Sequence, residues 1–199
     1  MAREIVTKVT NAILYDDGCI KIENIRFSYP HLDKAWKKEG TLGAEKFSLR
    51  GLLDKSTHKA AKDLIKKVIE EQVKLSKLPI GKNMWFLRDG DDSGKVEEAG
   101  MLTVSSSEAR RPSCRNRKGE VVDQDKVLDM FYGGAYGHML IRPWIQNNEH
   151  GKRINAGLIA VQFIKDGEPF GEGRIDDEGV FGSEGDDDDS GFDDDDGGL

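Results

Sequence analysis

Alternation of apolar and polar residues predicts several short β-strands. The clearest case is residues 45–53, EKFSLRGLL. One set of side chains is Phe47, Leu49 and Leu53, and the other is Lys46, Ser48 and Arg50. A period of two is typical of a strand with one buried face. Composition predicts further strands at residues 19–29, 83–88, 100–107, 136–146 and 154–164.

A helical period replaces this alternation between residues 56 and 78 and predicts one principal helix. Ser56 is expected to cap its N-terminus, and Pro79 and Gly81 are expected to end it. The apolar stripe consists of Leu64, Ile65, Val68, Ile69, Val73 and Leu75.

Turn-forming residues separate the predicted elements. Residues 1–18 are expected to be a lead-in that closes with Asp-Asp-Gly, and residues 31–43 are expected to be a loop. Pro30 is expected to end the first strand. Residues 147–151 are expected to join the last two strands as a hairpin with a longer loop.

Five or six strands with one helix, and no regular strand–helix alternation, predict a mainly β fold. The pattern is that of an antiparallel Greek-key barrel interrupted by one helix, which is the outline of an OB-fold. We expect one domain over residues 1–175 and an appendage over residues 176–199.

Charge is divided sharply between these two parts. Residues 176–199 contain twelve acidic residues and no Lys or Arg. Removing these twelve from the chain's 37 acidic residues leaves 25 against 30 basic residues, so residues 1–175 carry a charge of +5 although the chain carries −7. A basic body with an acidic tail favours a polyanionic partner. The alternative is a tail that only keeps a neutral domain soluble.

The last 18 residues have low sequence complexity. Residues 182–199 contain only Phe192 and Leu199 as large apolar side chains. Such a segment buries too little apolar surface to offset the entropy lost on ordering, so we expect it to be disordered.

The predicted strand at residues 136–146 has two different faces. The face expected in the core carries Gly137, Met139, Ile141, Pro143 and Ile145. The other face includes the candidate binding residues Tyr136, His138, Arg142 and Trp144. Aromatic rings stack on bases and cations contact phosphates, so this mixture is typical of single-strand binding. The alternative is that Tyr136 and Trp144 cover a second, smaller core.

Other basic residues are candidates for phosphate contacts, which supply much of the affinity for nucleic acid. The segment 110–118, RRPSCRNRK, is expected to be a loop with five positive charges. Trp36 lies among lysines and repeats the combination of aromatic and basic residues. The candidates are Lys46, Arg50, Arg88, Arg110 and Arg111. A solvated basic loop without a partner, and a hydrophobic plug at Trp36, are the alternatives.

Motifs of catalysis are missing from the sequence, so we expect no enzyme, cofactor or metal. It contains neither a G-x-x-x-x-G-K-[ST] phosphate loop nor a G-x-S-x-G elbow. Asp89, Asp91 and Asp92 are placed to bind a divalent metal, but a glycine-flanked acidic turn is usually only a turn.

Cysteine usage and hydropathy favour a cytoplasmic protein. Cys19 and Cys114 are 95 positions apart and are expected to be free thiols. No segment approaches the roughly 18 apolar residues of a membrane span.

Six segments in order resemble phage-encoded single-stranded-DNA-binding proteins of the OB-fold type, which serve replication and recombination. Their order and spacing, rather than any one motif, support the resemblance. They are RFSY at 26–29, KFSLRGLLDKST at 46–57, LRDGD at 87–91, SSSEARRP at 105–112, YGGAYGHMLIRPW at 132–144 and NAGLIAVQFIKDGEP at 155–169.

The resemblance implies a groove for single-stranded DNA and an acidic tail that competes with DNA for it. It also implies that the tail contacts replication proteins such as a polymerase or helicase. The related proteins often end with an aromatic residue, whereas this chain ends Gly-Gly-Leu, so Phe192 or Leu199 is the expected anchor. The tail candidates are Asp186, Asp187, Asp188, Asp189, Phe192, Asp193, Asp194, Asp195, Asp196 and Leu199.

Two other functions remain open at this point. One is an acidic-tailed chaperone for basic proteins, which would use the aspartate runs. The other is a metal-dependent nuclease that uses Asp89, Asp91 and Asp92. A homodimer is compatible with the sequence, and a phage protein would act in the host bacterial cytoplasm.

Overall fold

The structure is a computed structural model that describes residues 2–171. The expected tail and the expected boundary after residue 175 lie outside this range. Nine strands and two α-helices are present in the described part. The strands are β1 (Ile5–Val9), β2 (Ala12–Tyr15), β3 (Ile20–Trp36), β4 (Lys46–Asp54), β5 (Leu87–Asp89), β6 (Met101–Glu108), β7 (Ser113–Arg115), β8 (Tyr136–Asn148) and β9 (Gly151–Lys165). The helices are α1 (Lys59–Ser76) and α2 (Val127–Met130).

The strand order confirms a mainly β, OB-fold-like barrel with one principal helix. The sheet runs β5-β6-β4-β3-β8-β9-β7, and its central strands are antiparallel. The order β8-β3-β4-β6 is a Greek key, because the fourth strand returns beside the first. β6 and β9 lie against each other, so the sheet curls into a partly open barrel. A parallel bridge between Trp85, just before β5, and Ile154 of β9 connects the two sides where they meet.

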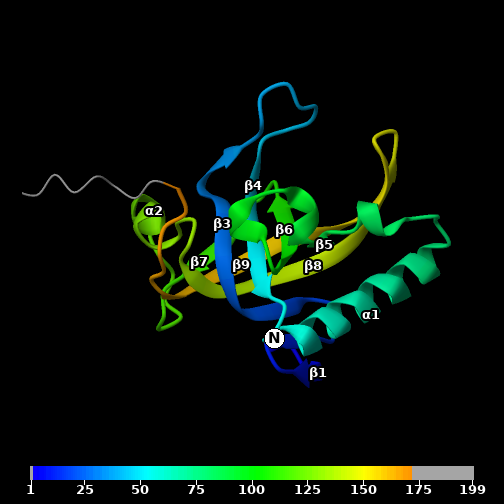
Figure 1. The fold of residues 1–199 in the computed structure, drawn as a ribbon, viewed down its shortest axis with the longest axis horizontal. Coiled ribbons are helices and arrows are strands. Elements are labelled where there is room, and N and C mark those ends of the chain that lie inside the picture. Colours follow the sequence, from blue (N-terminus) through cyan, green and yellow to red (C-terminus); the bar gives the residue numbers. More distant parts are fainter. Residues whose placement is uncertain (1, 172–199) are drawn as a thin grey trace, which may run out of the picture.

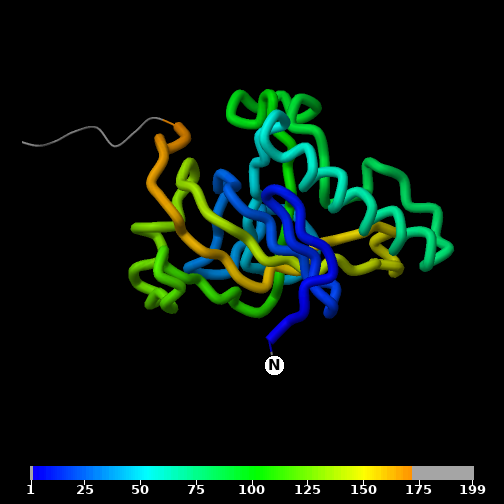
Figure 2. Tube along the Cα trace, turned by 90° about the horizontal axis from the view of Figure 1, so that it is seen from below, coloured from blue at the N-terminus to red at the C-terminus, as the bar shows by residue number. Residues whose placement is uncertain are grey.

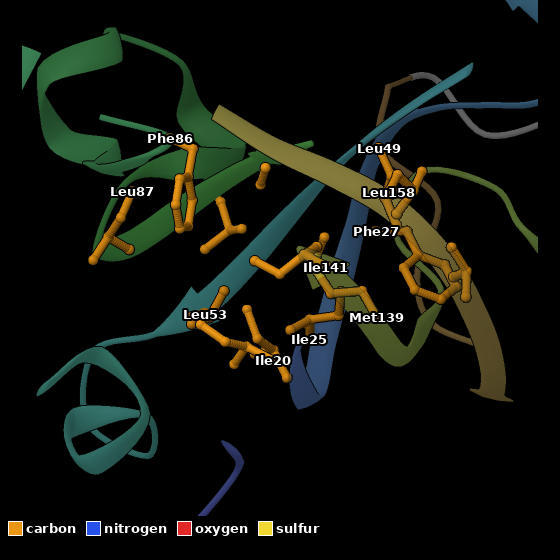
Figure 3. Packing of buried hydrophobic residues seen from close by; sticks show 14 of the residues in the cluster. Ile20, Ile25, Phe27, Leu49, Leu53, Phe86, Leu87, Met139, Ile141 and Leu158 are labelled. Carbon is orange, nitrogen blue, oxygen red and sulfur yellow. The ribbon is translucent and has the colours of Figure 1, made fainter. Parts of the chain in front are cut away.

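The interior of this barrel holds the hydrophobic core (Figure 3). Phe27 of β3 is fully buried, and Met139 and Ile141 of β8 are at most 1% exposed. Gly137 makes this packing possible, because a Cβ atom there would lie 2.3 Å from Cζ of Phe27. The alternation predicted for β8 is therefore correct on its core side, including its glycine.

Helix α1 follows β4 and packs beside the barrel (Figure 1). The predicted stripe is buried at Leu64, Ile65, Val68 and Ile69, but Leu75 is 81% exposed. The predicted cap is wrong. His58 is the N-cap residue, and it makes no side-chain capping bond. Asp54 Oδ1 instead accepts the backbone N–H of Ser56 at 2.7 Å, which holds Ser56 in the preceding turn.

The N-terminal 18 residues are not a lead-in. β1 and β2 form a hairpin, in which Val9 pairs with Ala12, and β2 pairs with β3. Asn11 adopts a left-handed φ of 63°, which short polar side chains tolerate in tight turns. Ile20 and Ile22 of β3 pair with β2 on one side and with β8 on the other, so the hairpin adds to the edge of β3 opposite to β8.

Pro30 does not end the first long strand. β3 continues to Trp36, and its register with β4 shifts between Ser28 and His31. A proline is tolerated at such an irregularity because no ladder hydrogen bond is required of it. The first part of the predicted loop at 31–43 is therefore strand.

Three smaller predictions also need correction. Only Leu87 and Arg88 of the segment 83–88 belong to a strand, after a short 3-10 helix at Lys82–Met84. The basic loop contains β7, which pairs in parallel with β9. Asn148 pairs with Gly151, so the hairpin loop has two residues and is not a longer one.

Candidate nucleic-acid interface

A groove of about 680 Å³ lies between α1 and the outer side of β5 and β6. OB-folds bind oligonucleotides on the face of their second and third barrel strands, which here are β4 and β6. We call this cavity the front groove. Its basic lining residues are Arg50, Lys62, Lys66, Lys82 and Arg88, and its acidic ones are Asp89, Asp92 and Glu98. Two of the predicted phosphate contacts, Arg50 and Arg88, are thus brought together, and three lysines join them.

Arg50 of β4 is held in place by a buried carboxylate. Its Nη1 forms an ion pair with Oε1 of Glu98, whose side chain is only 1% exposed. Lys95 Nζ lies 3.9 Å from the same oxygen. Glu98 belongs to a 3-10 turn, Val96–Glu98, in the connection between β5 and β6. A buried carboxylate requires such partners, so this connection and Arg50 fix each other.

Tyr29 is an exposed aromatic residue beside Arg50. It has a left-handed φ of 46°, and 48% of its surface is accessible. Lys95 Nζ lies 4.1 Å from its ring centroid, and the guanidinium carbon of Arg50 lies 5.7 Å away. Its hydroxyl donates a hydrogen bond to Glu97 Oε1 at 2.8 Å. Tyr29 was not among the predicted binding residues, because a tyrosine before a proline is typical of a strand end.

Arg88 and two lysines of the front groove carry uncompensated charge. Arg88 Nη2 donates to the backbone oxygen of Asn83 at 2.9 Å, and its Nε donates to that of Trp85 at 3.3 Å. Within residues 2–171, no carboxylate lies within ion-pair distance of Arg88, Lys62 or Lys82. These three charges are available to phosphates.

Further candidates gather where β3 passes into β4. Trp36 is 46% exposed and stacks on His31, with ring centroids 4.4 Å apart. Lys46 pairs in register with Trp36. Arg111 Nη2 donates to the backbone oxygen of Asp33, and its guanidinium carbon lies 5.3 Å from the ring centroid of Phe47. Arg110 is exposed next to it.

The outer face of β8 lies elsewhere on the barrel. β3 separates β8 from β4, so the structure does not bring Tyr136, His138 and Arg142 to the front groove. Tyr136 is half-buried, with Lys165 Nζ 4.8 Å and the guanidinium carbon of Arg26 5.5 Å from its ring centroid. Its ring thus already interacts with cations of its own chain.

The other β8 candidates have different surroundings. His138 Nδ1 accepts the backbone N–H of Asn24 at 3.0 Å. Arg142 Nη2 lies 3.2 Å from Asp17 Oδ2. Trp144 is 42% exposed and lies near the β8–β9 hairpin, which projects beyond the barrel (Figure 1). Of the four, Trp144 presents the most accessible aromatic ring.

The acidic turn considered as a metal site is tied together by hydrogen bonds. Lys55 Nζ lies 2.6 Å from both Asp89 Oδ1 and Asp91 Oδ2. Asp91 Oδ1 also accepts the backbone N–H of Gly100 at 2.6 Å. The hydrogen bonds from Gly100 and Lys55 lower the pKa of Asp91, and the bond from Gly100 has the larger effect. Among the described residues, no three His, Cys, Asp or Glu side chains are grouped to hold a metal ion.

No helix in residues 2–171 is both long and apolar enough to cross a membrane.

Fold and groove together define a small β-barrel of the class that binds oligonucleotides. Residues 19–191 match the family described as "Enterobacter phage Enc34, ssDNA-binding protein". The chain belongs to this family of single-stranded-DNA-binding proteins, which are non-enzymatic.

Solved structures of the phage Enc34 protein are similar to this chain. The protein in complex with single-stranded DNA is 40% identical, with a TM-score of 0.81 over 85% of this chain and 98% of that one. A second structure of the Enc34 protein has a TM-score of 0.79 over 90% of this chain and 99% of that one.

Two further relatives extend the comparison. Protein p50 of Acyrthosiphon pisum secondary endosymbiont phage 1 is 30% identical over 168 residues, which are 78% of this chain and 88% of p50. The single-stranded-DNA-binding protein gp2.5 of bacteriophage T7 is 12% identical with a TM-score of 0.57, over 77% of this chain and 95% of that one. The likeness to gp2.5 concerns the fold alone.

Proposed function

We propose that this protein coats single-stranded DNA during phage replication and recombination, in the host bacterial cytoplasm. The observation that carries the proposal is the front groove, where Lys62, Lys82 and Arg88 have no acidic partner among the described residues. A relative that is 40% identical has been solved in complex with single-stranded DNA, which supports the same ligand here.

The strand would cross the outer face of β4 and β6, with phosphates toward the groove lysines and Arg88. Tyr29 and Trp36 are exposed aromatic residues beside this path and would stack on bases. Every base has a π-face, so such contacts tolerate any sequence. Lys46, Arg110 and Arg111 would contact phosphates where the strand passes the end of β3.

We assign two roles to the acidic tail, residues 176–199, on the basis of its charge of −12. Its aspartates resemble a run of phosphates in charge, and covalent attachment keeps such a segment at an effective concentration on the order of mM. The tail would therefore compete with DNA for the front groove. Once DNA displaces it, the tail would be free to recruit partners such as a polymerase or helicase.

Two neighbouring lysines on α1 offer a matched test of the binding site. Lys66 lines the front groove, whereas Lys67 does not, and each has a glutamate four residues later at 3.6 Å and 4.0 Å. We expect Lys66→Ala to weaken oligonucleotide binding and to reduce the salt slope by about 0.7. Lys67→Ala should change neither.

The measurement is fluorescence anisotropy of a labelled oligonucleotide across a salt titration. Equal effects of the two substitutions would contradict the groove as the binding site. If the full chain bound basic proteins but no single-stranded DNA, the acidic-tailed chaperone would be the better description.

A further inference from the structure

A second cavity lies on the outer side of β8 and β9, away from the front groove. It has a volume of about 390 Å³, and we call it the rear pocket. Figure 2 views the molecule from the side on which the N-terminal segment lies, and this segment contributes to the pocket. Its polar lining residues are Arg3, Tyr15, Lys21, Arg115, His138 and Gln162.

A basic turn borders the rear pocket. It comprises Arg115, the last residue of β7, and Arg117 and Lys118, which follow it, and all three are exposed. Gln162 Nε2 donates to the backbone oxygen of Asn116 at 3.2 Å, which ties the turn to the pocket wall. Arg115 Nη1 donates to the backbone oxygen of Gly119 at 2.7 Å. Within residues 2–171, neither arginine of this turn has a carboxylate at ion-pair distance.

The other two cations of the pocket are held by acids. Lys21 Nζ lies 2.6 Å from Glu23 Oε1, and Arg3 Nε lies 2.7 Å from Asp17 Oδ2. Both pairs are partly exposed, so solvent screens them and they contribute little stability. The two pairs hold the side chains of Lys21 and Arg3 in place in the lining of the pocket.

His138 adds a neutral hydrogen-bond donor. Its Nδ1 accepts the backbone N–H of Asn24, so the neutral ring carries its proton on Nε2. Burial, and the nearby charge of Lys21, lower the pKa of His138, which keeps the ring neutral at pH 7. Leu140 and Ala160 supply apolar parts of the lining.

We propose that the rear pocket and its basic turn form a second phosphodiester-binding site, which takes a further segment of the single strand outside the front groove. Cations, a neutral N–H donor and apolar lining match the phosphate, sugar and base of a nucleotide. The inference rests on the proposed function. It gives a role to His138, which lines the rear pocket and not the front groove.

The site predicts a dependence on oligonucleotide length. OB-folds cover about 4–16 nucleotides, so a strand of about 6 can fill the front groove alone and one of about 20 can reach both sites. Arg115→Gln/Arg117→Gln should leave affinity for the short strand unchanged. For the long strand it should weaken binding and reduce the salt slope by about 1.4, which corresponds to two contacts.

The measurement is anisotropy with DNA in excess over full-length protein, so that each strand holds one molecule. Lys67→Ala/Lys74→Ala is the control, because both lysines are exposed on α1 and line neither cavity. Lys21→Gln tests the pocket through a different element and should show the same length dependence. Thermal unfolding checks that each variant is folded.

Each outcome decides one question. Equal long-strand affinity of the parent and Arg115→Gln/Arg117→Gln would overturn the second site, as would an equal loss with both strand lengths. Failure of the parent protein to bind the short strand while it binds the long one would instead overturn the front groove as the main site.

Discussion

Arg50 on the outer face of β4 forms an ion pair with Glu98, a residue of the β5–β6 connection whose side chain is almost completely buried. The pair has two consequences. It holds the guanidinium of Arg50 on the face where we place DNA. It also makes the stability of the fold depend on Arg50, the residue that is expected to contact DNA.

Removal of Arg50 should therefore affect stability as well as binding. Arg50→Ala leaves Glu98 buried with only Lys95 nearby. Breaking a buried pair costs about 3–5 kcal/mol, but Arg50 is 32% exposed, so we expect about 1–3 kcal/mol. Arg50→Ala/Glu98→Gln should recover part of this loss, since no charge remains buried. Urea denaturation of both variants measures the difference, and identical stabilities of the parent and Arg50→Ala would contradict the role of the pair.

Tyr29 offers a test of stacking that separates its ring from its hydroxyl. Tyr29→Phe removes only the hydrogen bond to Glu97, and we expect it to retain most of the affinity for single-stranded DNA. Tyr29→Leu removes the ring and should cost about 1–3 kcal/mol, the usual contribution of a stacked base. Anisotropy titrations of both variants provide the comparison. Similar affinities for the two would mean that no base stacks on Tyr29.

The strand faces were predictable from the sequence, but their positions around the barrel were not. Alternation identified which side chains of β4 and β8 face the core, as Leu49 and Met139 show. It did not indicate that β3 separates the outer faces of these two strands. That separation follows from the order of pairing, which depends on contacts between residues far apart in the sequence.

Two local features were missed for physical reasons. Pro30 was expected to end a strand, yet the irregular register around it lets β3 continue to Trp36. Lys62 and Lys66 border the front groove because of the rotation at which α1 packs beside the barrel, and Lys82 borders it from the 3-10 helix Lys82–Met84. An apolar stripe in the sequence identifies the buried side of a helix, but it does not identify the elements that lie beside the helix's polar side.

Arg110 and Arg111 should differ although they are neighbours. Arg110 is exposed, so Arg110→Ala should weaken binding to all sequences alike and reduce the salt slope by about 0.7. Arg111 also packs near Phe47 and bonds to the backbone of Asp33. Arg111→Ala should therefore lower the melting temperature as well. Salt titrations with several oligonucleotide sequences, together with thermal unfolding, test both statements; a loss confined to one sequence would contradict phosphate contact.

Asp17 links the N-terminal segment to β8 and should make stability depend on pH. Burial acts to raise the pKa of its carboxyl, but hydrogen bonds from Arg3 and Cys19 outweigh burial and lower it below the ordinary 3.8. A lowered pKa stabilises the fold above the unfolded value of 3.8, and this contribution disappears as the pH falls through the lower folded value. Asp17→Asn should be less stable than the parent at pH 7.

The difference between the two proteins should shrink as the pH decreases below 3.8. Urea denaturation at pH 7, 4 and 3 gives the measurement. A stability difference that stayed constant over this range would show that the ionised carboxylate is not the stabilising group.

Competition by the tail follows from charge and tethering. A body of +5 is joined to a segment of −12, so the two parts attract each other most strongly at low salt, where screening is weak. Removal of residues 176–199 should then tighten the binding of single-stranded DNA, and the gain should diminish as salt rises. It should also allow weak binding of duplex DNA, because the front groove would no longer be occupied by acidic residues.

The control keeps the tail but removes its charge. Replacement of the eight aspartates in 186–189 and 193–196 by asparagine preserves length and Phe192. If electrostatic competition operates, this variant should bind DNA nearly as tightly as the truncated protein. If Phe192 occupies a base position instead, the asparagine variant should resemble the parent, and Phe192→Ala should tighten binding on its own. Salt titrations of oligonucleotide affinity for all four proteins distinguish these cases. If truncation brought no gain at low salt, the tail would not be an autoinhibitor, and recruitment of basic partners by its aspartates would become its main role.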